Sequence, residues 1–108
     1  MVRNTYMSSM LLYRSKLTLI HATSKMVGIC EIKIWKINDL KSYPLGLKYS
    51  LFCVEAASGK IIVGFDNHFP KGPHKHIGAE IEEPYEYVND DLLVEDFWRE
   101  VDMRGFIL

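Results

Sequence analysis

The sequence predicts an α+β fold, a single two-layer domain in which a four-stranded antiparallel meander packs against a C-terminal helix. Three observations predict it. Apolar and polar residues alternate in several segments between residues 15 and 66, and apolar residues recur at helical spacing after residue 89. The composition, 48% hydrophobic and 25% charged, is that of one ordinary globular domain rather than a disordered chain.

The first two predicted strands follow an N-terminal segment, residues 1–14, that is expected to form an arm or a short helix. Residues 15–108 are expected to form the domain. Within it, residues 16–22, KLTLIHA, alternate and predict a strand. Residues 27–37, VGICEIKIWKI, are the clearest strand, because Cys30, Ile32 and Ile34 fall on one face and the charged residues on the other. The two strands are expected to pair antiparallel.

The remaining elements are a hairpin, a long loop and a helix. Residues 47–55 and 60–66 predict two strands joined by a short connection that ends in glycine. Residues 66–85, DNHFPKGPHKHIGAEIEEPY, look too irregular for helix or strand. Asn89 can cap a helix that Gly105 ends, and one face of that helix is apolar: Leu93, Val94, Phe97, Trp98 and Val101.

The environment of the protein is predicted from its cysteines and its apolar runs. Cys30 and Cys53 sit in apolar segments and form no CxxC pair, which indicates reduced core residues. No apolar run approaches the roughly 20 residues that span a bilayer, and no secretory signal is recognisable. A cytoplasmic protein with no membrane partner is expected. A chain this small buries a limited core, so a homodimer or a protein partner is plausible.

The net charge of −1 hides a strong asymmetry along the chain. Residues 1–79 carry 11 Lys or Arg against 4 Asp or Glu, whereas residues 80–108 carry 2 against 10. The basic part could present a positive face to a polyanion. Alternatively, the two parts neutralise each other within the fold.

The segment KGPHKH carries the candidate chemistry. It brings Lys71, His74, Lys75 and His76 within six residues. Histidine moves protons near neutral pH and lysine neutralises phosphate, a combination suited to RNA cleavage without a metal or other cofactor. His74 and His76 are then the catalytic pair, Lys71 and Lys75 the phosphate-binding groups, and Asp66 an orienting group.

Two other interpretations of this segment remain open. Exposed loops collect Lys and His without any catalytic purpose. The second interpretation is a metal site formed by His74 and His76 with His68 or Asp66, although no Cys or Glu stands at a recognised ligand spacing. Among the aromatic residues, Tyr85 is the candidate for stacking on an RNA base, and Lys48 is a candidate for added positive charge. P-loop, dinucleotide-binding, nucleophile-elbow and zinc-finger patterns are absent from the sequence.

The motifs EIKIWKI, GLKYSLFCV, GFDNHFPKGPHKHIG, EEPYEYV and LLVEDFWREV, in this order, resemble the TumE family of toxins from type II toxin–antitoxin systems. The resemblance covers roughly residues 15 to 103. It places Phe65, Asp66 and Asn67 at the strand end of the family pattern. The loop positions are Lys71, Gly72, His74 and His76, and the later positions are Glu83, Pro84, Tyr85, Asp96, Phe97 and Trp98.

The resemblance implies a toxin that acts as a ribonuclease and is silenced by a DNA-binding antitoxin. Two positions depart from the pattern: Pro73 stands where many members have aspartate, and Lys75 where they have arginine. Pro73 removes a carboxylate and a backbone donor, so a mechanism that needs that acid is in doubt. Two alternatives to a metal-independent ribonuclease are kept: a non-catalytic module that binds an antitoxin through the loop and the acidic helix, and a metal-dependent nuclease.

Overall fold

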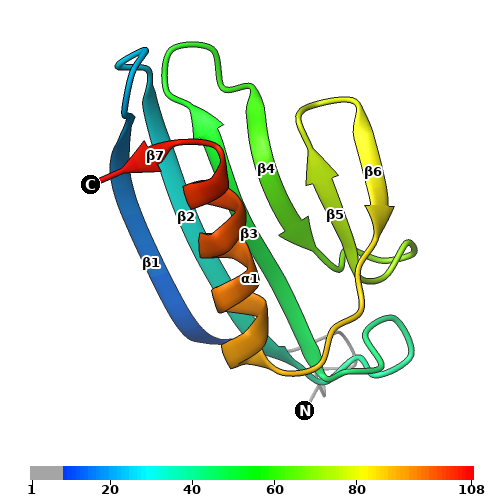
Figure 1. Ribbon diagram of the computed structural model, residues 1–108. Helices are drawn as coiled ribbons and strands as arrows, with labels where there is room; N and C mark the ends of the chain where they lie inside the picture. The colour runs from blue at the N-terminus through cyan, green and yellow to red at the C-terminus, as the bar shows by residue number, and fades with distance from the viewer. Residues whose placement is uncertain (1–8) are drawn as a thin grey trace.

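The computed structural model describes residues 9–108, which form one antiparallel sheet and one helix (Figure 1). The strands follow the order β6-β5-β4-β3-β2-β1-β7. Their bounds are β1 Ser9–His21, β2 Val27–Ile37, β3 Leu47–Glu55, β4 Ile61–Asp66, β5 His74–Ile77, β6 Ile81–Pro84 and β7 Phe106–Ile107, and α1 spans Asp90–Met103.

The prediction of a four-stranded meander is therefore wrong, although the helix-on-sheet arrangement is right. The meander has six strands, and β7 adds a seventh beside β1. β5 and β6 lie in the segment that was expected to be irregular. They form because the free edge of β4 offers unpaired backbone groups, which His74–Ile77 satisfy with no need of an apolar pattern. Gly78, at φ +67°, then turns the chain into β6.

The N-terminal prediction spans two regions of the chain. Residues 9–14, expected in the arm or short helix, belong to β1, and residues 1–8 lie outside the described residues. β1 is long because β2 is long: it pairs with β2 from Ser9 opposite Ile37 to Ile20 opposite Val27. A register shift at Leu12 interrupts this pairing, as one extra residue in a strand does.

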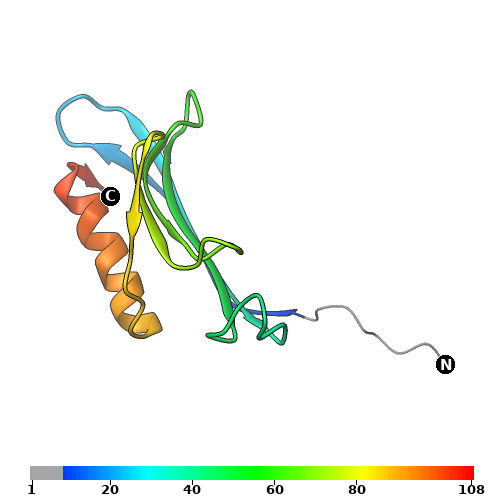
Figure 2. The same cartoon turned by 90° about the vertical axis from the view of Figure 1, so that its right-hand side faces the viewer.

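The helix covers one face of the sheet, and within the described residues no helix covers the other (Figure 2). The Asn89 side chain accepts a hydrogen bond from the Leu92 N–H at 2.8 Å, which confirms the predicted cap. Leu93, Phe97 and Val101 are buried against the sheet. Gly105 ends the helix at φ +87°, and the following residues return as β7.

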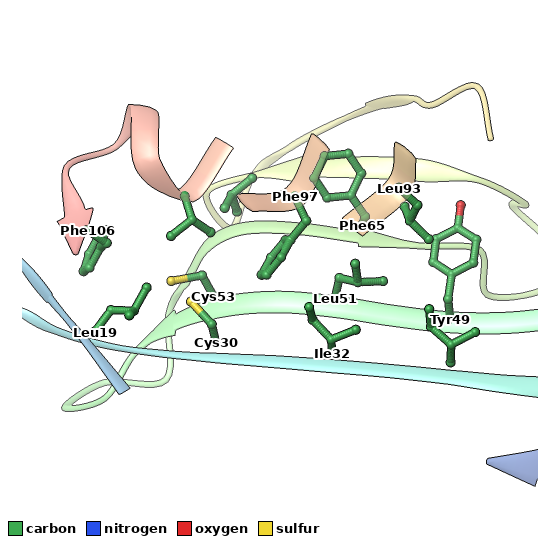
Figure 3. Close-up of a cluster of buried hydrophobic side chains, with 13 residues drawn as sticks. Leu19, Cys30, Ile32, Tyr49, Leu51, Cys53, Phe65, Leu93, Phe97 and Phe106 are labelled. Carbon is green, nitrogen blue, oxygen red and sulfur yellow. The ribbon is translucent and has the colours of Figure 1, made fainter. Parts of the chain in front are cut away.

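The core lies between α1 and the sheet face that it covers (Figure 3). Cys30 and Cys53 are opposite each other on β2 and β3, and both thiols are free and buried, as predicted for packing residues. Ile32 and Leu51 form the next buried pair along the same two strands. In the described part of the chain, no helix is both long and apolar enough to cross a bilayer.

Candidate functional site

The candidate site lies on the sheet face that α1 leaves uncovered. Along β4, Val63 and Phe65 are buried toward the helix, so Gly64 and Asp66 face the other way. Directly opposite residues of paired strands share a face. Asp66 is opposite His74, and Gly64 is opposite His76, so both histidines lie on the uncovered face with Asp66.

Asp66 binds both histidines at once. Its Oδ1 lies 3.0 Å from the Nε2 of His74, and its Oδ2 lies 3.2 Å from the Nε2 of His76. The two imidazole rings stand edge to face, with centroids 4.7 Å apart. Asp66 also accepts a hydrogen bond from the backbone N–H of His68 at 3.2 Å. The carboxylate thus fixes the orientation of both rings.

His74 has an oxygen atom at each ring nitrogen. Its Nδ1 lies 2.7 Å from the carbonyl oxygen of Gly72, and its Nε2 faces Asp66. A carbonyl and an ionised carboxylate accept hydrogen bonds only, so an imidazolium ring that donates from both nitrogens satisfies the arrangement. Gly72 presents its carbonyl from φ +75°, a conformation that favours glycine. The side chain of His74 is 9% exposed.

His76 differs from His74 at its second nitrogen. Among the described residues, no hydrogen bond is made by its Nδ1. If the Nε2 of His76 donates its proton to Asp66, the Nδ1 carries a free lone pair. The two rings are therefore chemically distinct, one suited to give a proton and the other to take one.

Phe52 supports His76 from the neighbouring strand. Its ring centroid is 5.3 Å from that of His76. The ring lies directly on Gly64, since a Cβ at that position would come within 2.2 Å of two ring carbons. Glycine is needed here for the close approach, which places the Phe52 ring beside the imidazole.

Lys71 is paired with Glu82 of β6. Its Nζ lies 2.8 and 2.9 Å from the two carboxylate oxygens. One of these oxygens is also 3.5 Å from the Nε2 of His74. The hydrogen bond from Lys71 is the main reason that the pKa of Glu82 is lowered. A negatively charged oxygen therefore already lies between Lys71 and His74.

Lys75 and Tyr85 lie on the opposite face from the histidines. Lys75 is paired with Phe65 on the helix side, and its Nζ is 3.0 Å from Glu100 of α1. The hydroxyl of Tyr85 donates to Asp96 of α1 at 2.6 Å, and its ring packs edge to face on Phe65. The structure thus separates two of the four residues predicted to bind RNA or phosphate, Lys75 and Tyr85, from His74 and His76.

Lys48 lies on the uncovered face, together with two residues that sequence reasoning did not select. Lys48 is opposite Trp35, and Lys33 lies two residues before Trp35 on the same face of β2. Their Nζ atoms are 5.8 and 5.7 Å from the ring centroid. Because Ser50 follows Lys48 on the same face and is opposite Asp66, the tryptophan is near the site. The alternation K-I-W-K in β2 was the available signal, since it places Lys33 and Trp35 on one face.

The other predicted and neighbouring residues have structural contacts. The Nδ1 of His68 is 3.5 Å from the hydroxyl of Tyr43. Asn67 is buried and joins the end of β4 to β3, accepting from the Tyr49 N–H and donating to the Leu47 carbonyl, each at 2.8 Å. These two hydrogen bonds of the Asn67 amide fix the position of Asp66, the preceding residue. This structural role of Asn67 was not predicted from the sequence.

Asp66, His74 and His76 also have the chemistry of metal ligands. One ligand atom from each lies within 4.8 Å of the others. Two ligands that each lie about 2.0 Å from a tetrahedral zinc ion are about 3.3 Å apart. The imidazole nitrogens of His74 and His76 lie 3.0 and 3.2 Å from the two different oxygens of Asp66. His74 also shows the usual support of a metal ligand, an Nδ1 held by a backbone carbonyl. The donor set therefore fits a divalent transition metal as well as proton transfer.

Comparison with known proteins gives one match. The model of a family described as Toxin TumE matches residues 8–104, nearly the whole chain. No curated protein and no solved structure matches the chain.

Proposed function

The chain belongs to the TumE family and is therefore the toxin of a toxin–antitoxin system, and we propose that it acts as an endoribonuclease through Asp66, His74 and His76. The observation that carries the proposal is the single carboxylate that binds one nitrogen of each imidazole on an uncovered sheet face. Pro73 contributes no carboxylate, and this mechanism does not need one there, because Asp66 serves both rings.

The contacts assign a role to each residue. His76, through its Nδ1 lone pair, removes the proton from a ribose 2′-hydroxyl, and the oxygen attacks the adjacent phosphorus. His74 holds its Nε2 proton against Asp66 and donates it to the departing 5′-oxygen, which takes the second acceptor position at that nitrogen, where the Glu82 oxygen lies 3.5 Å away. The P–O5′ bond breaks, and the products are a 2′,3′-cyclic phosphate and a 5′-hydroxyl. Asp66 touches both imidazoles and stabilises each in its charged form, so it is a positioning residue.

Positive charge on the same face supports a path for the RNA. The Glu82 oxygen between Lys71 and His74 marks where a phosphate oxygen could bind after that carboxylate moves away. Trp35, with Lys33 and Lys48 beside its ring, offers a surface for base stacking with cations to neutralise the backbone. Lys75 and Tyr85 have no part in this path, since they face the helix.

The test is RNA cleavage and growth arrest by a His74→Ala/His76→Ala variant. Loss of a general acid or base costs about 10²- to 10⁴-fold in rate, so cleavage and toxicity should both disappear. Because Asp66 loses both of its imidazole partners, the thermal unfolding midpoint is expected to fall, and activity is compared at a temperature where both proteins are folded. His21→Asn is the matched control, because His21 lies in β1 at the far side of the sheet and its Nδ1 contacts only the following turn, the Thr23 and Ser24 N–H groups and the Thr23 hydroxyl. Full toxicity in the double variant would exclude the proposal. Failure of the pure wild-type protein to cleave RNA at any pH would favour a non-catalytic binding module.

A metal-dependent nuclease is the second candidate, favoured by the three ligand atoms described above. When bound, a divalent ion would supply an activated water molecule and neutralise charge on the phosphate. In that case Asp66, His74 and His76 would hold the ion, and Gly72 would orient His74. Cleavage that survives EDTA supports the acid–base mechanism, whereas cleavage lost in EDTA and restored by Zn²⁺ or Mn²⁺ supports the metal.

A further inference from the structure

β1 has an open edge. β7 pairs with β1 only at Ile20 and His21. In the described part of the chain, no other strand lies on that side, so the outer backbone edge from Ser9 to Leu19 is available for pairing. At about 3.3 Å per residue, this edge is long enough for a strand of about ten residues from another chain.

Large apolar side chains are exposed along this edge. Leu12 is 49% exposed, Tyr13 47% and Leu17 39%. Natural sheets protect an open edge with charges, bulges, proline or a covering segment. β1 has two of these features, the charges of Arg14 and Lys16 and the register shift at Leu12, but its large apolar side chains stay exposed, and apolar residues on an open edge indicate an interaction site.

Two hollows lie between this edge and α1. The first, of about 440 Å³, is lined by Leu17, Leu19, Trp98, Val101 and Ile107, with Asp102 at its wall. The second, of about 370 Å³, is lined by Leu12, Tyr13, Ile34 and Val94, with Asp90 and Asp91 beside them. Alternate side chains of a strand that pairs with β1 would point toward this side of the sheet.

We propose that the antitoxin binds this edge by adding an extended segment as a further strand beside β1. The inference rests on the family membership that provides an antitoxin partner and is independent of the ribonuclease mechanism. The segment places apolar side chains in the two hollows. Basic residues next to them meet Asp90, Asp91 and Asp102 of α1, and acidic residues on its other face meet Arg14 and Lys16.

Charge argues against a second copy of the chain in the registers centred on residues 14 to 16. Arg14 and Lys16 lie on the same face, opposite Lys33 and Glu31 of β2, and Arg14 is already paired with Glu31 at 3.0 Å. Antiparallel self-pairing centred on Ser15 would place Arg14 directly opposite Lys16 of the second copy, and centring on either basic residue would place it opposite itself. Like charges directly opposite each other destabilise a strand pair. A partner with an acidic residue opposite Lys16 avoids this repulsion, since Arg14 already has Glu31 as its ion-pair partner.

The test measures binding of the purified protein encoded beside the toxin gene to the wild-type toxin and to Tyr13→Asp and Leu17→Asp variants. Each substitution should raise the Kd at least 20-fold. Ile81→Asp is the matched control, since Ile81 is 55% exposed on β6, the strand at the opposite edge of the sheet, and its Kd should stay within two-fold of wild type. In cells, the two β1 variants should still arrest growth when the antitoxin is co-expressed.

Hydrogen exchange on the wild-type complex tests the same surface without a substitution. Amides within Ser9–Leu19 should exchange at least ten-fold more slowly in the complex than in the free toxin. Unchanged exchange there, or equal Kd values for the β1 variants and the control, would overturn the proposal. So would loss of self-association by the free toxin variants in sedimentation, because the edge would then join two copies. RNA cleavage is scored separately, so its absence would affect only the proposed mechanism.

Discussion

Replacing Gly64 with alanine should disturb the candidate site from a position that carries no functional group. A Cβ at residue 64 would lie 2.2 Å from two carbons of the Phe52 ring. Ordinary carbon contacts are about 3.5–4.0 Å, so the ring must move by at least about 1.3 Å. Because the Phe52 and His76 rings are 5.3 Å apart, that movement either pushes the imidazole or removes its support.

The magnitudes follow from packing and from catalytic geometry. Forcing one methyl group into a packed site costs about 1–3 kcal/mol, so Gly64→Ala should lower the free energy of unfolding by that amount. Misplacing a reacting group by about 1 Å can cost about 100-fold in rate, so RNA cleavage should fall at least ten-fold. Phe52→Ala removes the obstructing ring, so the double variant should be more stable than the sum of the single effects predicts, by about 1–2 kcal/mol.

Urea unfolding of the wild type, both single variants and the double variant gives the coupling energy. Cleavage of a fluorescent RNA by the same four proteins gives the effect on rate. Additive free energies within about 0.5 kcal/mol would show that Phe52 does not lie on Gly64 as described. Wild-type cleavage by a destabilised Gly64→Ala variant would show that His76 does not depend on Phe52.

Three further predictions concern stability and RNA binding. The Tyr49 hydroxyl is buried without a hydrogen-bond partner among the described residues, so Tyr49→Phe should raise the free energy of unfolding by about 1 kcal/mol in urea titrations; destabilisation would reveal a partner. Burial alone would raise the pKa of Glu100, but hydrogen bonds from Lys75 and Arg104 outweigh it and lower the pKa from its usual 4.5. Glu100→Gln should therefore lower the free energy of unfolding by about 1–2 kcal/mol at pH 7. The difference in free energy of unfolding between this variant and the wild type should shrink as the pH falls below 4.5, and a difference that persists in acid would contradict a lowered pKa of Glu100. Trp35→Ala should weaken binding of single-stranded RNA by about 1–3 kcal/mol in fluorescence titrations while Trp35→Phe retains it, and equal affinities would exclude stacking there.

The sequence predicted those strands whose two faces meet different surroundings. β2 and β3 have the predicted bounds because one face packs on α1 and the other does not, which produces a clear alternation. β5 and β6 were missed because they are held by backbone pairing at the edge of the sheet. All four residues of β6 are exposed, and β5 consists largely of histidine and lysine. Neither strand carries an apolar period that sequence reasoning could detect.

The failure to predict β5 as a strand also explains which residues of the candidate site were predicted. Asp66, His74 and His76 were named from residue type, and the structure brings them together. Lys75 was grouped with them because it lies between the histidines in the sequence. In a strand, adjacent side chains point to opposite faces, so the pairing that aligns His74 with His76 also turns Lys75 toward the helix. Had the segment been recognised as a strand, Lys75 would have been assigned to the helix side.

The charge asymmetry acquires a physical explanation from the two faces of the sheet. On the helix face, an acidic residue of α1 neutralises a basic residue of the sheet, as Glu100 does for Lys75. On the uncovered face, Lys33 and Lys48 lie beside an aromatic ring rather than beside the acidic helix, and Lys33 is also 3.8 Å from Glu31 of β2. The acidic C-terminal segment thus neutralises part of the basic sheet, and the sheet separates the rest from that helix. A polyanion that approached from the helix side would be repelled, so RNA binding is expected on the face that carries Asp66, His74 and His76.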